Sequence, residues 1–221
     1  MSEYQYYEFL AIDRPLTDQE QGTLRKYSSR ATITSSRFVV NYSWGGFRGN
    51  AADWMEKYFD AFLHLANWGT HELMLRLPQN VLPLVKAKQY CAGDSASARA
   101  KGGHLVLSFR SDDEEGGEWV DEDNDTLASL LPVRTELASG DLRALYLTWL
   151  GCAGLGELED EDPEPPCPPG LGKLSADDAA LERWVTALPE AEKTSILARL
   201  REEHARKPSL IERLRKAGLA T

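Results

Sequence analysis

Residues 43–50, SWGGFRGN, hold the side chains of this sequence best suited to binding a ligand. Trp44 or Phe47 could stack on a planar ring, and Arg48 could hold an anion beside the start of a following helix. The same residues also suit a turn, in which the aromatic rings cover the edge of the core and Asn50 caps a helix. Because such turns far outnumber ligand-binding loops, we expect mainly a turn, with Trp44, Phe47 and Arg48 as candidate ligand or partner contacts.

A second set of reactive side chains, Arg48, His71, Cys91 and His104, would form a site only if the fold brought them together. Nothing in their spacing requires this, and the four histidines form no metal-binding motif. The patterns of phosphate loops, dinucleotide loops and GxSxG hydrolases are also absent. We therefore assign no catalytic, cofactor-binding or metal-binding residue. We expect a non-enzymatic protein, with an enzyme built on these four residues as the alternative.

Acidic side chains are concentrated in residues 112–125, where their oxygens could bind a divalent cation. A calcium loop would need glycine where Thr126 follows the run Asp121 to Asp125. We therefore expect a solvated acidic loop that could contact a basic partner, and we leave cation binding open.

The overall composition makes some partners less favourable than others. The 221 residues carry a formal net charge of -10, which repels nucleic acids and anionic lipids. Three scattered cysteines suit a reducing compartment, and no apolar run has the length of a membrane span. The sequence predicts a cytoplasmic, soluble protein without a membrane partner, for which nucleic acid is an unfavourable partner.

Hydrophobic periodicity predicts an α+β fold. A capping box at Thr17 and Glu20 indicates a helix over 18–28, and an apolar stripe over Trp54–Ala66 indicates a second helix. Strands are expected over 4–12, 31–42 and 70–78, followed by a hairpin over 94–110. We expect about five strands in a mixed or antiparallel sheet with helices packed on one face, resembling an elaborated ferredoxin-like core. A helical stretch over 126–150, divided at Gly140, completes a domain of residues 1–150.

The C-terminal third has a different composition. Residues 151–174 are rich in proline and acidic side chains, which predicts an extended linker. The pattern of residues 175–221 predicts three short amphipathic helices, too few to bury a large core of their own. We expect Trp184 of this module to pack on a protein partner, a second copy or the first domain. Weak nucleic-acid association through the same helices is a further alternative.

Four stretches resemble a family of conserved bacterial proteins of unknown function. They are EYQYYEFLAIDRPLT, NYSWGGFRGN, WMEKYFDAFLHLANWG and DPEPPCPPGLGKLS. The resemblance covers roughly the first 175 residues. It implies a bacterial, intracellular setting, but no activity and no site residue.

Overall fold

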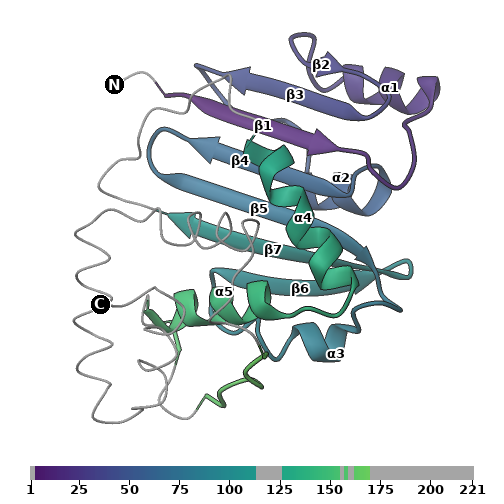
Figure 1. Cartoon of the computed structure of the whole chain (residues 1–221). Helices are drawn as coiled ribbons and strands as arrows, with labels where there is room; N and C mark the ends of the chain where they lie inside the picture. The colour runs from purple at the N-terminus through teal and green to yellow at the C-terminus, as the bar shows by residue number, and fades with distance from the viewer. Residues whose placement is uncertain (1–2, 113–125, 155–156, 159–161, 170–221) are drawn as a thin grey trace.

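The computed structural model describes residues 3–112, 126–154, 157–158 and 162–169 (Figure 1). The expectations for residues 175–221, including Trp184, and for most of the acidic run 112–125 lie outside these residues.

Within these segments, seven strands form one antiparallel sheet in the order β2-β3-β1-β4-β5-β7-β6. The strands are β1 (Gln5–Leu10), β2 (Thr32–Ile33), β3 (Arg37–Tyr42), β4 (Ala61–Ala66), β5 (Thr70–Pro78), β6 (Ala96–Lys101) and β7 (His104–Asp112). The helices are α1 (Asp18–Arg25), α2 (Ala51–Lys57), α3 (Leu84–Ala87), α4 (Thr126–Ala138) and α5 (Arg143–Gly154). The predicted α+β class is confirmed, but the sheet has more strands than the five expected.

Helices cover both faces of the sheet, which corrects the expectation of helices on one face only. Helices α4 and α5 pack on one face, here called the α4 face (Figure 1). Helices α1 and α2 pack on the opposite face, here called the α2 face. The reason is visible in β4, where Phe62 belongs to the core on the α2 face and Leu63 to the core on the α4 face. Central strands that are apolar on both sides need two covering layers.

The predicted helix over Trp54–Ala66 is wrong in its second half. Helix α2 ends at Lys57, and residues 61–66 form the central strand β4. Because β4 is buried on both faces, its apolar residues do not alternate with polar ones, and a short apolar run cannot be assigned by periodicity alone.

Asp60 stabilises the change from helix to strand. Its side chain is fully buried, and its Oδ2 accepts the backbone N–H groups of Ile12 at 2.7 Å and Asp13 at 2.9 Å. Its Oδ1 lies 2.6 Å from Nη2 of Arg76 on β5. Asp60 therefore ties the end of β1 to the start of β4 through these hydrogen bonds, and to β5 through the ion pair.

Several local predictions are confirmed. Thr17 and Glu20 form the capping box of α1, and the Asn50 side chain caps α2. Gly102 and Gly103 both have positive φ in the turn between β6 and β7, and Gly140 has φ 91° between α4 and α5. The strand expected over 31–42 is divided into β2 and β3 by a turn.

Part of the proline-rich segment contacts the sheet domain. The Tyr90 hydroxyl donates to the Pro166 carbonyl at 2.8 Å, and the Tyr146 hydroxyl donates to Oε1 of Glu164 at 2.8 Å. The boundaries expected at 150 and 174 stay predictions, although α5 extends to Gly154. Among the helices of the described segments, none combines the length and the apolar character needed to cross a bilayer.

Candidate functional site

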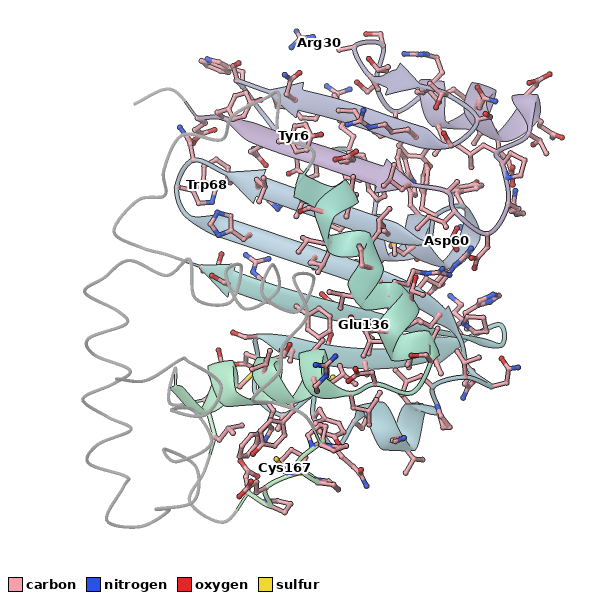
Figure 2. All side chains as sticks on the ribbon, in the orientation of Figure 1. Tyr6, Arg30, Asp60, Trp68, Glu136 and Cys167 are labelled. Atoms are coloured by element: carbon pink, nitrogen blue, oxygen red, sulfur yellow. The ribbon has the colours of Figure 1, made fainter. Side chains whose placement is uncertain are left out.

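A cavity of about 460 Å³ lies beside the β2–β3 end of the sheet. One wall consists of residues 25–30, which connect α1 to β2. The other wall consists of Tyr42, Trp44, Gly45, Gly46 and Arg48, from the end of β3 and the segment after it. Figure 2 shows Arg30 at this end of the sheet, far from Cys167 at the other end.

Local hydrogen bonds hold both walls in place. On the first wall, Nη1 of Arg25 donates to the Ala31 carbonyl, so the end of α1 is tied to the start of β2. On the second wall, Nε2 of Gln5 donates to the Gly45 carbonyl at 2.8 Å. Gly45 has φ 71°, a backbone conformation that glycine adopts without the strain that other residues would incur. The walls are therefore fixed to β1 and β2, which belong to the sheet.

Phe47 has the structural role expected of a turn residue. Its ring stacks on Tyr7 at a centroid distance of 5.2 Å and meets Trp54 edge-on at 4.7 Å. A Cβ at position 49 would lie 2.5 Å from the Phe47 ring, so Gly49 is needed for this packing. Phe47 therefore anchors the segment to the core and does not line the cavity.

Trp44 and Arg48 belong to the cavity. Trp44 is 87% exposed, an unusual state for so large an aromatic side chain. Arg48 is also exposed and lines the same cavity. The segment 43–50 thus combines a structural turn, through Phe47 and Gly49, with two side chains available for contact.

The electrostatic character of the cavity follows from which of the described arginines form no ion pair with a described carboxylate. In the described segments, each arginine outside the cavity forms an ion pair with a carboxylate: Arg14, Arg37, Arg76, Arg99, Arg110, Arg134 and Arg143. Arg25, Arg30 and Arg48 form no ion pair with the described residues, and all three line the cavity. Lys26 adds a fourth cation, and no described carboxylate lines the walls. The cavity is therefore a cationic site in a chain of net charge -10.

The fold does not bring Arg48, His71, Cys91 and His104 together. His71 pairs with Ser111 on β7, whereas His104 pairs with Pro78 on β5, seven residues further along β5. At about 3.3 Å per residue, the two histidines stand about 23 Å apart.

Cys91 lies in yet another place. It packs against the core on the α4 face, and burial raises the pKa of its thiol to about 12. A thiol with this pKa remains protonated at neutral pH and is a poor nucleophile.

A row of polar side chains crosses the α2 face and was not foreseen from the sequence. His64 on β4, Glu72 on β5 and Arg110 on β7 are direct cross-strand neighbours. The His64 ring stacks on Tyr7 at 4.3 Å, and its Nε2 has no hydrogen-bond partner among the described residues. Burial, with smaller effects from nearby charges, lowers the pKa of His64 to about 4 and raises the pKa of Glu72. The fold therefore favours the neutral forms of His64 and Glu72 more than water does.

The first wall of the cavity was also missed. Residues 25–30, RKYSSR, are strongly basic in an acidic chain, and that contrast is the signal that could have found them. Their position opposite residues 42–48 depends on the pairing of β2 with β3, which local sequence does not specify.

Comparison of the chain with protein-family models, curated proteins and solved structures gave no match. In the described segments, no group of three or more His, Cys, Asp and Glu side chains has an arrangement that could hold a metal ion. The geometry of the cavity is therefore the basis on which a function can be proposed.

Proposed function

We propose that this protein is a non-enzymatic interaction component whose sheet domain binds an anion in the cationic cavity. The observation that carries the proposal is the distribution of unpaired arginines: all three in the described segments line this one cavity. The expected docking of residues 175–221, through Trp184, on a protein partner or a second copy remains part of the proposal.

Placing several guanidinium groups around one cavity is unfavourable without a counter-charge, because like charges repel at short range. A bound carboxylate or phosphate would relieve this repulsion. Arginine also suits the task, because its planar group can donate two parallel hydrogen bonds to one anion. The cavity is concave and within the range of about 300–1,000 Å³ that is typical of small-ligand sites.

Binding is favoured over catalysis by the chemistry of the walls. Among the described residues, the walls consist of arginine, lysine, tyrosine, tryptophan, serine and glycine, and they hold no imidazole, thiol or carboxylate. The described lining therefore lacks the groups that most often transfer protons in enzymes. The separation of His71, Cys91 and His104 also gives no support to the enzyme alternative.

For the fold, we propose an elaborated ferredoxin-like core. The elements β1, α1, β3, α2 and β4, with the short β2, follow the β-α-β-β-α-β order, and both helices pack on one face. Strands β5, β7 and β6 extend this core from β4. The cavity lies at the β2 edge of the sheet, on the opposite side of the core from this extension. This likeness of topology carries no function by itself.

The setting proposed from the sequence is the bacterial cytoplasm, with no membrane partner. Nucleic-acid association through residues 175–221 stays the weaker alternative, because the net charge of -10 opposes it.

A charge-reversal experiment tests the proposed anion site. Thermal unfolding of the full chain would be followed with orthophosphate, pyrophosphate and citrate, at constant ionic strength. At least one anion should raise the Tm of the wild type, and the double variant Arg30→Glu/Arg48→Glu should lose that response. Arg99→Glu is the matched control, because Arg99 is similarly exposed but lies outside the cavity. An unchanged response in the double variant, or no response in the wild type to any anion, would contradict the proposal.

A further inference from the structure

We infer that the anion taken by this cavity is a nucleoside phosphate, that is, a phosphate joined through a sugar to a planar base. The inference rests on the proposed anion-binding function and specifies its ligand. It is carried by the combination of cationic and aromatic side chains around one small cavity.

The first step concerns the phosphate. Arg25 and Arg30 approach the cavity from the α1 side, and Arg48 approaches from the segment after β3. Arg25 is held by its hydrogen bond to the Ala31 carbonyl, so part of its conformational freedom is already lost before a ligand arrives. A phosphate has several oxygens that can accept from guanidinium groups on two sides, whereas a single carboxylate has only two oxygens.

The second step concerns the base. Three aromatic side chains in the described segments are exposed, namely Tyr27, Trp44 and Trp68, and the first two line the cavity. Tyr27 is fixed edge-on against Trp54 at 5.1 Å, whereas Trp44 projects from the segment with 87% of its surface exposed. An exposed indole beside arginines is the arrangement that stacks on a nucleobase in single-stranded nucleic-acid sites.

The third step concerns size. A cavity of about 460 Å³ can hold one nucleotide, because small-ligand sites occupy about 300–1,000 Å³. A longer strand would extend beyond the cavity, onto surface for which no comparable set of arginines and exposed aromatic rings is found in the described segments. An acidic peptide could use the arginines, but it would leave the exposed indole without a specific role. The observations therefore favour a single nucleotide.

The test is isothermal titration of the full chain with defined probes. The probes are the four common nucleoside monophosphates, ribose 5-phosphate, adenosine, orthophosphate, a six-residue glutamate peptide and a ten-nucleotide single strand. We expect at least one monophosphate to bind tenfold or more tightly than ribose 5-phosphate, and adenosine to bind tenfold or more weakly than AMP.

Two variants separate the contributions of base and phosphate. Trp44→Ala should reduce nucleotide affinity about tenfold and leave ribose 5-phosphate binding unchanged, while Trp44→Tyr should restore most of the loss. Arg48→Ala should weaken both ligands. Trp68→Ala is the control, because Trp68 is exposed but lies outside the cavity.

The other outcomes distinguish failure of the nucleoside inference from failure of the proposed anion site. Equal binding of ribose 5-phosphate and every nucleotide would overturn the nucleoside inference and leave the anion site standing. Tighter binding of the single strand than of any monophosphate, or binding of the peptide alone, would overturn it in the same way. Failure of all the anions to bind would overturn both the inference and the proposed function.

Discussion

Arg25, Arg30 and Arg48 differ from the other described arginines because they have no carboxylate partner among the described residues. Arg76 shows the opposite situation, because its guanidinium is almost fully buried against Asp60. At the residue scale, the molecule thus uses arginine in two ways. Paired arginines such as Arg37 and Arg76 tie neighbouring strands together, and the arginines without an ion pair surround the cavity.

The buried pair leads to a prediction about stability. Burial alone would raise the pKa of Asp60, but N–H groups of Asp13 and Ile12 and the Arg76 guanidinium lower it. Asp60→Ala should leave Arg76 buried without its partner and reduce the free energy of unfolding by about 3–5 kcal/mol. Arg110→Ala, which breaks a half-exposed pair with Asp112, should cost less than about 1 kcal/mol. Urea unfolding of both variants measures the difference, and similar losses would contradict the role given to Asp60.

His64 leads to a prediction about pH. Burial, together with the nearby charges of Arg110 and His71, outweighs the opposite effect of Asp112 and lowers the pKa of His64 to about 4. The unfolded chain therefore takes up this proton near pH 6.5, before the folded chain does, so stability is lost as the pH falls from 6.5 towards 4. A shift of this size corresponds to roughly 3 kcal/mol.

His64→Phe isolates this effect from the titration of carboxylates, because a phenyl ring can keep the stacking on Tyr7. The wild type should lose more unfolding free energy between pH 7 and pH 4 than the variant does. Parallel losses in both proteins would show that His64 is not held neutral by the fold.

At the scale of elements, the segment after β3 must place Phe47 inward while Trp44 and Arg48 face the cavity. Gly49→Ala should therefore destabilise the protein by about 1–3 kcal/mol, because its Cβ would overlap the Phe47 ring. Gly46→Ala is the matched control, since the atom nearest to its Cβ would be 3.8 Å away. Thermal unfolding of the two variants checks this, and equal Tm values would contradict the packing described for Phe47.

The sequence predicted correctly those elements whose signals come from residues close together in the chain. The capping box of Thr17 and Glu20 and the turn at Gly102 and Gly103 involve neighbours in the chain. Strand β4 could not be recognised, because burial on both faces removes the alternation that marks a strand. Half of the cavity was also missed, since residues 25–30 reach Trp44 and Arg48 only through the pairing of β2 with β3.

At the scale of the whole molecule, the described part of the proline-rich segment contacts the sheet domain. Oε2 of Glu157 accepts the Ser95 backbone N–H at 3.0 Å, and Tyr90 donates to the Pro166 carbonyl. Truncation after Leu174 keeps these contacts and should leave the Tm of the sheet domain nearly unchanged. Truncation after Gly154 removes them and should lower the Tm by several degrees, which corresponds to a loss of about 1–2 kcal/mol in the free energy of unfolding. Equal Tm values for the two truncated chains would contradict a structural role for these contacts.

The molecule as a whole is acidic, with a cationic cavity at one end of its sheet. The most direct test of the account is a titration of the ¹⁵N-labelled full chain with each of the four common nucleoside monophosphates, followed by amide chemical shifts. We predict shift changes concentrated in residues 25–30 and 42–48, which line the cavity or lie between its lining residues, and their loss in Arg30→Glu/Arg48→Glu. Changes centred instead on the row of His64, Glu72 and Arg110, or no saturable change at all, would contradict the account.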